Sequence, residues 1–73
     1  MDLFGVRLKA LKEQKNCTYP QIAEHLGLSA PRTVKGYVAG TVKPDFYKLI
    51  ALADYFNVSL DYLVGRSDDP SIH

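Results

Sequence analysis

Residues that end helices recur at short intervals along this chain, and they limit its fold more than any other feature does. They are Asn16, Gly27, Gly40, Asn57 and Gly65. Asparagine and glycine tolerate the left-handed conformation that closes a helix. Between these residues the apolar side chains repeat at helical intervals, and no segment shows the alternation of a half-buried strand. The sequence therefore predicts an all-α protein with helices over residues 2–15, 18–26, 31–39, 45–56 and 59–64.

Residues that start helices precede most of these segments. Thr18 and Gln21 form a capping box, in which each side chain accepts a hydrogen bond from the other residue's backbone N–H. Asp45 and Ser59 are predicted N-caps of the fourth and fifth helices.

The third helix has a less regular start. Ser29 or Ala30 is expected to cap it, with Pro31 in its first turn, where the missing N–H has no intrahelical partner.

The inward faces of the helices follow from the same spacing. The predicted core consists of Phe4, Leu8, Leu11, Ile22, Ala23, Leu26, Val34, Tyr37, Val38, Phe46, Leu49, Ile50, Leu52, Ala53 and Phe56. A chain of 73 residues has room for one core. We therefore expect a single domain over residues 1–66, followed by a polar tail over residues 67–73.

Several classes of function are excluded by what the sequence lacks. Its longest apolar run covers residues 49–53, too short to span a membrane, and there is no export signal. Cys17, His25 and His73 stand in no cluster that holds a metal or activates a nucleophile. The sequence therefore predicts a cytoplasmic protein that is not an enzyme, with no cofactor and no metal, and Cys17 as a small buried thiol.

The net charge is only +1, but the charge is unevenly distributed. Residues 1–44 carry seven lysines and arginines against three acidic residues, a balance of +4, and residues 45–73 carry two against five, a balance of −3. This asymmetry indicates that the N-terminal half faces an anion.

The second and third helices are separated by a tight turn over residues 27–29, which is the arrangement of a helix-turn-helix. The pattern Ile22-Ala23-x-x-Leu26-Gly27-Leu28 has a mechanical reason. Ala23 is small where the next helix crosses it, and Leu28 fills the corner behind Gly27.

These residues, together with residues 7–11 and the closing stretch over residues 49–66, resemble the Cro and lambda-repressor type of helix-turn-helix family, also called Xre-type. The resemblance covers nearly the whole chain, and the run from Ala53 to Arg66 is its most specific part. It implies a compact five-helix, lambda-repressor-like domain. In this family the third helix enters the major groove of double-stranded DNA, usually as a dimer on a palindromic operator.

The resemblance also implies which residues read the bases. The corresponding positions are Pro31, Arg32, Lys35 and Gly36. Arg32 is expected to do most of the reading, because its planar guanidinium can donate to O6 and N7 of guanine together. Thr33 is expected to add a methyl or hydroxyl contact.

The DNA backbone is expected to be held by Thr18, Tyr19, Lys35 and Lys43. Tyr19 stands where family members usually carry a glutamine, and it is compatible with a phosphate contact or with packing over the first helix. Where the family often pairs an arginine with a glutamate, this chain has Lys12 and Val38. Near Ser29–Pro31 this chain has one residue more than family members usually have, and we expect this residue to change the direction of the recognition helix.

Gly36 is unfavourable inside a helix, which indicates close approach of its backbone to DNA. The alternative is simple drift or close packing against another helix. If DNA is the neighbour, Gly36→Ala should raise thermal stability and impair binding.

The sequence therefore predicts a sequence-specific DNA-binding transcriptional regulator, a repressor of a bacterium, phage or mobile element. The alternative is a protein-interaction module of the same fold, like an antirepressor or an antitoxin. No small-molecule ligand is expected, because the chain has no room for a ligand-binding domain.

A homodimer on an inverted-repeat operator is expected, with recognition helices about 34 Å apart, because one domain reads too few base pairs for selective binding. The interface is expected to use Tyr55, Leu60, Tyr62 and Val64. The alternative is that these side chains belong to the core of a lone domain.

Overall fold

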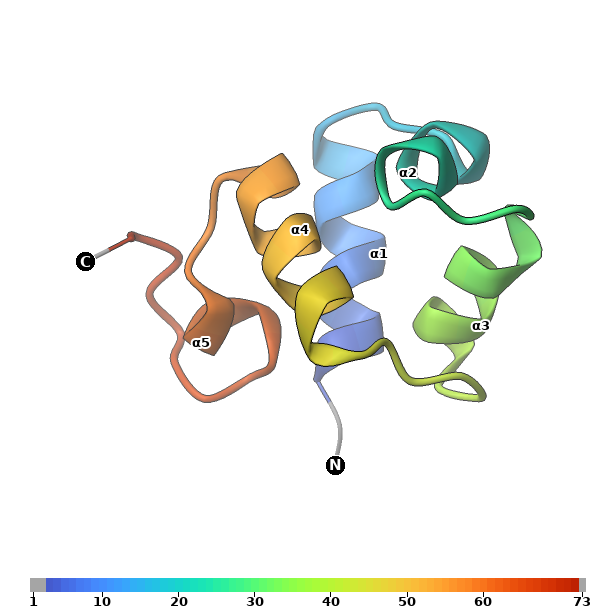
Figure 1. Cartoon of the computed structure of the whole chain (residues 1–73). Helices are drawn as coiled ribbons and strands as arrows, with labels where there is room; N and C mark the ends of the chain where they lie inside the picture. Colours follow the sequence, from blue (N-terminus) through green and yellow to red (C-terminus); the bar gives the residue numbers. More distant parts are fainter. Residues whose placement is uncertain (1–2, 73) are drawn as a thin grey trace.

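The computed structural model describes residues 3–72 and contains the predicted succession of helices (Figure 1). The helices are α1 (Phe4–Gln14), α2 (Tyr19–His25), α3 (Arg32–Ala39), α4 (Phe46–Phe56) and α5 (Leu60–Leu63). No strand occurs within residues 3–72, so the all-α prediction is confirmed. Asp2, where the first helix was expected to begin, lies outside the described residues, as does His73.

The helix ends follow the predicted signals. All five of the predicted helix-ending residues have positive φ angles, between 54° and 87°. Thr18 and Gln21 form both hydrogen bonds of the capping box. Asp45 accepts a hydrogen bond from the Lys48 N–H, and Ser59 accepts one from the Tyr62 N–H. These caps are confirmed.

The start of α3 differs from the prediction. Its N-cap is Pro31, which already has helical backbone angles, with φ −62° and ψ −25°, and no side chain caps the helix. The first N–H groups are held by backbone carbonyls instead, since Thr33 donates to Ala30 and Val34 donates to Pro31. The predicted cap at Ser29 or Ala30 was wrong, because the fixed φ of proline starts the helical turn without a side-chain acceptor.

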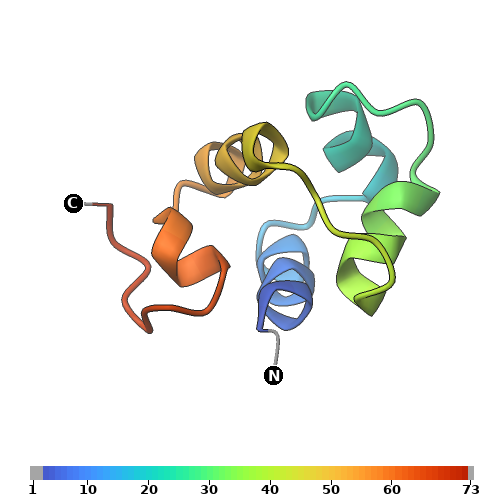
Figure 2. The ribbon, with the colours of Figure 1, turned by 60° about the horizontal axis from the view of Figure 1, so that its bottom comes forward.

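The core lies where the helices meet. Its most deeply buried large side chains come from all five helices: Leu8, Ile22, Val34, Leu52, Phe56 and Leu63. α1 contacts both α3 and α5, and in Figure 1 these two helices lie on opposite sides of it. Figure 2, turned by 60°, keeps α5 and α3 at opposite ends of the molecule.

Two predicted core residues of α4 face outward. Phe46 is 62% exposed and Ile50 is 36% exposed. Phe46 belongs to the first turn of α4, and Ile50 lies about 100° around the helix from Leu49. The inward stripe is therefore formed by Leu49, Leu52, Ala53 and Phe56, and including Phe46 and Ile50 in it was wrong.

The residues after α5 are tied back to α1 by one arginine. The Arg7 guanidinium donates to the carbonyl oxygens of Tyr62 and Ser67, forms an ion pair of 2.7 Å with Asp68, and lies over the Tyr62 ring. The Ser59 N–H donates to the Pro70 carbonyl at 2.9 Å. Residues 67–70 are thus held to the domain by hydrogen bonds while residues 68–70 remain exposed, and the boundary after residue 66 stays a prediction.

Candidate nucleic-acid interface

The turn between α2 and α3 has the geometry that the helix-turn-helix pattern requires. Gly27 has a φ of 71°, and the Leu28 N–H donates to the Ala23 carbonyl at 2.9 Å. Ala23 is only 3% exposed, and α2 packs against α3. The turn therefore fixes α3 against the rest of the domain and leaves its other face outward.

The two faces of α3 differ sharply. Val34 and Tyr37 are buried, and the Tyr37 ring packs near the Phe4 ring, with centroids 6.2 Å apart. Burial raises the pKa of the Tyr37 hydroxyl, so this group stays protonated in the core. The opposite face is open to solvent.

That open face contains most of the predicted base-reading positions. Pro31, Arg32 and Lys35 are exposed, and Thr33 and Gly36 are half-buried. Arg32 and Lys35 lie three residues apart, so they are neighbours on the helix surface. Neither forms an ion pair within residues 3–72. α3 thus presents two cations at one exposed edge.

Gly36 is explained by a neighbour within the chain. A Cβ at this position would lie 2.6 Å from Cγ2 of Val42, in the loop after α3. The N–H groups of Thr41 and Val42 both donate to the Gly36 carbonyl, which holds the loop against the helix. Close approach within the chain is therefore present, and a DNA contact at Gly36 stays a prediction.

The ring of Tyr19, at the start of α2, is flanked by two lysines. The Nζ atom of Lys12 on α1 lies 4.5 Å from the ring centroid, and that of Lys35 on α3 lies 5.6 Å from it. Tyr19 is half-buried and packs against the core, as the packing interpretation predicted. Sequence reasoning did not include Lys12 among the site residues, although its match to the family's basic position near the end of the first helix was a usable signal.

Two further residues predicted to contact the DNA backbone are Thr18, directly before α2, and Lys43, after α3. Thr18 is exposed, and its oxygen accepts the Gln21 N–H at 3.2 Å, which leaves the hydroxyl proton free to be donated outward. Lys43 is exposed in the loop between α3 and α4.

Cys17 and His25 meet around one tyrosine but form no chemical site. The Tyr55 hydroxyl donates to Cys17 Sγ at 3.6 Å, and this hydrogen bond raises the pKa of Tyr55. The His25 ring packs on the Tyr55 ring, with centroids 4.5 Å apart. Cys17 is half-buried rather than buried, because it lies between α1 and α2 at the edge of the core. No group of three possible metal ligands occurs within residues 3–72.

Among the helices of the described chain, none has the length and apolar character needed to cross a membrane.

Comparisons with known proteins agree with this geometry. The helix-turn-helix family model matches residues 8–63. YobD, an HTH-type transcriptional regulator of Bacillus subtilis, is 41% identical over 68 residues, which are 93% of this chain and 60% of that protein. AnsR, another HTH-type transcriptional regulator of Bacillus subtilis, is 38% identical over 60 residues, 82% of this chain and 51% of that protein.

A solved structure extends the likeness to three dimensions. The crystal structure of a transcriptional regulator from Listeria innocua matches with a TM-score of 0.84 and 45% identity, over 89% of this chain and 60% of that one. This chain spans between half and three-fifths of the length of these relatives, which are named as transcriptional regulators and not as enzymes. The matched segment contains α2, the turn and α3, and the chain belongs to the helix-turn-helix family.

Proposed function

We propose that this chain is a sequence-specific DNA-binding transcriptional regulator. The observation that carries the proposal is the exposed edge of α3, on a helix fixed by a helix-turn-helix. There Arg32 and Lys35 have no acidic partner among residues 3–72. A rigid helix with outward cations suits the major groove, whose width admits an α-helix and whose walls are phosphates.

In this proposal α3 lies in the major groove, and its N-terminal residues reach the base edges. Arg32 reads a guanine, and Thr33 and Pro31 lie against neighbouring bases. Lys35, Lys43, Thr18 and Tyr19 hold the phosphates on either side, which positions α3 without reading sequence.

The regulator acts as a repressor in the bacterial cytoplasm. A DNA-bound domain of this kind regulates most simply by covering an operator. The relatives named as transcriptional regulators support the regulatory role.

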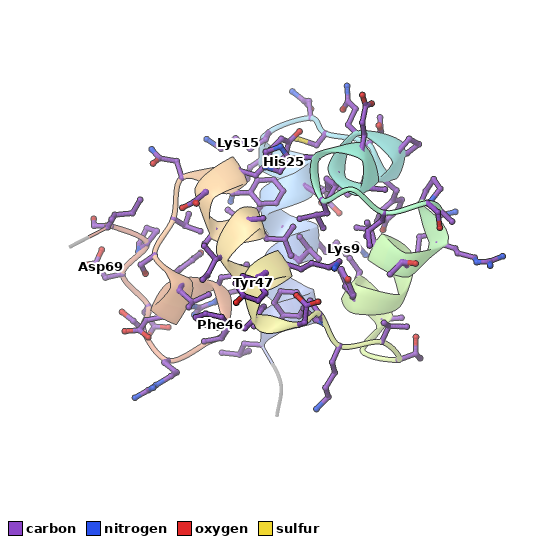
Figure 3. All side chains as sticks on the ribbon, viewed as in Figure 1. Lys9, Lys15, His25, Phe46, Tyr47 and Asp69 are labelled. Atoms are coloured by element: carbon purple, nitrogen blue, oxygen red, sulfur yellow. The ribbon has the colours of Figure 1, made fainter. Side chains whose placement is uncertain are left out.

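The operator-bound form is a homodimer on an inverted repeat, but the structure changes which residues are suited to the interface. Tyr55, Leu60 and Tyr62 pack against the core, whereas Phe46 and Tyr47 on α4 are 62% and 79% exposed. Both aromatic side chains project from the first turn of α4 in Figure 3.

The surface next to these aromatic residues suits a second copy of the same chain. Ile50, one turn after Phe46, lines an open groove of about 340 Å³ whose other walls include Leu60, Ile72 and the acidic residues Asp54 and Asp61. Antiparallel packing of two α4 helices would seat the aromatic residues of each copy at the groove of the other.

A duplex-binding titration at several salt concentrations tests the DNA-binding role. Lysines and arginines that neutralise phosphates release counterions, so the affinity should fall steeply with salt. Selection of bound sites from random DNA should then return an inverted repeat. A chain that bound no duplex would overturn the proposal and favour the protein-interaction alternative.

A further inference from the structure

Three helices converge on the Tyr19 ring, and two of them bring a lysine to it. Lys12 comes from the last turns of α1 and Lys35 from the middle of α3, and their ammonium nitrogens lie 4.5 Å and 5.6 Å from the same ring centroid. These residues are 23 positions apart in the sequence. Their meeting at one ring is a product of the tertiary fold.

The arrangement gathers positive charge without a negative partner. Neither lysine forms an ion pair within residues 3–72, where the described pairs join Arg7 to Asp68 and Lys48 to Asp45. The face of an aromatic ring attracts a cation but carries no net charge to neutralise it. Two ammonium groups at one ring therefore make this part of the surface attractive to an anion.

The position of the cluster indicates which anion this is. Lys35 lies one turn beyond Arg32 on the exposed face of α3, so the cluster borders the surface proposed to enter the major groove. Major-groove walls consist of phosphodiesters. Tyr19 faces this border from the start of α2 while its ring packs against the core.

We propose that Lys12 and Lys35 together bind one phosphodiester of the DNA backbone, and that the Tyr19 ring positions both ammonium groups for it. This inference rests on the proposed function and adds Lys12 to the interface. It assigns Tyr19 a role through its ring face rather than through a hydroxyl hydrogen bond to phosphate.

The test measures binding to a fluorescent duplex of about 20 base pairs of mixed sequence, because a backbone contact does not depend on base identity. Lys12→Gln and Lys35→Gln should each weaken binding and flatten the slope of log affinity against log salt. The double variant should flatten it by about one unit in all, because the two lysines neutralise one phosphodiester. Arg66→Gln is the matched control for net charge, since Arg66 is exposed shortly after α5. In Figures 1 and 2, α5 lies at the other end of the molecule from α3. Arg66→Gln should leave the slope nearly unchanged.

Two variants of Tyr19 separate the ring from the hydroxyl. Tyr19→Phe keeps the ring face and Tyr19→Leu removes it, so Tyr19→Leu should bind the duplex about two- to fivefold more weakly than Tyr19→Phe does. Equal losses in both variants would overturn the ring's positioning role. Thermal unfolding of each variant shows whether the fold is retained, and Tyr19→Phe is the reference if Tyr19→Leu is destabilised.

The outcomes distinguish this inference from the function on which it rests. If the original chain binds the duplex with a steep salt slope and Lys12→Gln leaves that slope unchanged, the phosphate site is wrong and the DNA-binding function stands. If the original chain does not bind the duplex, the proposed function and this inference both fall.

Discussion

The backbone of Val38 crosses α1 directly over Gly5. A Cβ placed on Gly5 would lie 2.5 Å from the Val38 carbonyl oxygen, a separation that real Cβ atoms essentially never show. The neighbouring atom is backbone, so it cannot swing away as a flexible side chain would. Only glycine lets α1 and α3 approach this closely.

Gly5→Ala should therefore destabilise the domain even though alanine favours helices. We expect a loss of about 2 kcal/mol, because overpacking a tight contact outweighs the gain in helix propensity. In a domain of this size, each kcal/mol lowers Tm by about 4–8 °C. Ala10→Gly, at an exposed position of the same helix, is the control for helix propensity alone. A Gly5→Ala variant that melts at or above the original temperature would contradict the close crossing.

Gly36→Ala should also lower stability, in contrast to the rise expected if DNA were the neighbour. The new Cβ meets the Val42 side chain at 2.6 Å, and we expect a loss of about 1 kcal/mol. Val42→Ala removes the nearest methyl group and leaves Cβ of residue 42 at 3.1 Å, so Gly36→Ala should cost less in that background. A double-mutant cycle by thermal unfolding measures this coupling. Additive effects would mean that the Val42 contact does not control the cost.

Arg32→Ala and Lys43→Ala should impair DNA binding in different ways. Loss of the Arg32 guanidinium should cost about 1–3 kcal/mol and relax discrimination at one base pair. Loss of Lys43 should weaken binding to all sequences alike and flatten the salt slope by about one unit. Competition among variants of a selected operator measures the difference. Unchanged relative preferences in Arg32→Ala would rule out its base-reading role.

Replacing Phe46 and Tyr47 with serine should weaken self-association by about tenfold or more, because exposed aromatic residues contribute much of the binding energy at interfaces. Sedimentation of the free protein and the stoichiometry on a selected duplex measure the effect. Val6→Ser is a matched control, since Val6 is 58% exposed on α1. If the variant with serine at positions 46 and 47 still bound the duplex as two copies and self-associated as strongly as the original chain, the α4 surface would not be the interface.

Asp45 should make the stability of α4 depend on pH. The Lys48 N–H, which donates to its carboxylate at 2.9 Å, holds the pKa of Asp45 below its ordinary value. The ionised form is thus favoured in the folded state, so its contribution is present above the unfolded-state pKa and is lost as pH falls through the folded-state pKa. Asp45→Asn keeps a capping side chain without the charge. The free energy of unfolding of Asp45→Asn should therefore lie below that of the original chain at neutral pH, and the difference should shrink at acidic pH. A difference that did not depend on pH would contradict this account.

Much of the fold could be predicted because its signals are local. Asn16 and Asn57 adopt positive φ, and Thr18, Asp45 and Ser59 cap the helices that follow them. A turn or a cap depends on a few adjacent residues, whose side chains satisfy or release backbone groups within one helical turn. The number and order of the helices followed from the same local chemistry.

Local reasoning failed to predict which residues of the fourth helix are buried. Phe46 has the spacing of a core residue but is exposed, because burial depends on where α4 meets the other helices and not on α4 alone. The cap of α3 was also misassigned, since a proline with helical angles started the helix without a side-chain acceptor.

For the candidate site, the residue types along α3 and the helix-turn-helix spacing indicated the exposed basic edge in advance. The role proposed for Lys12 could not be predicted from spacing, because it depends on how α1, α2 and α3 meet at the Tyr19 ring. The close neighbours of Gly5 and Gly36 could not be predicted from the sequence for the same reason. Each close approach brings together atoms of two separate segments, and it exists only once the helices have packed.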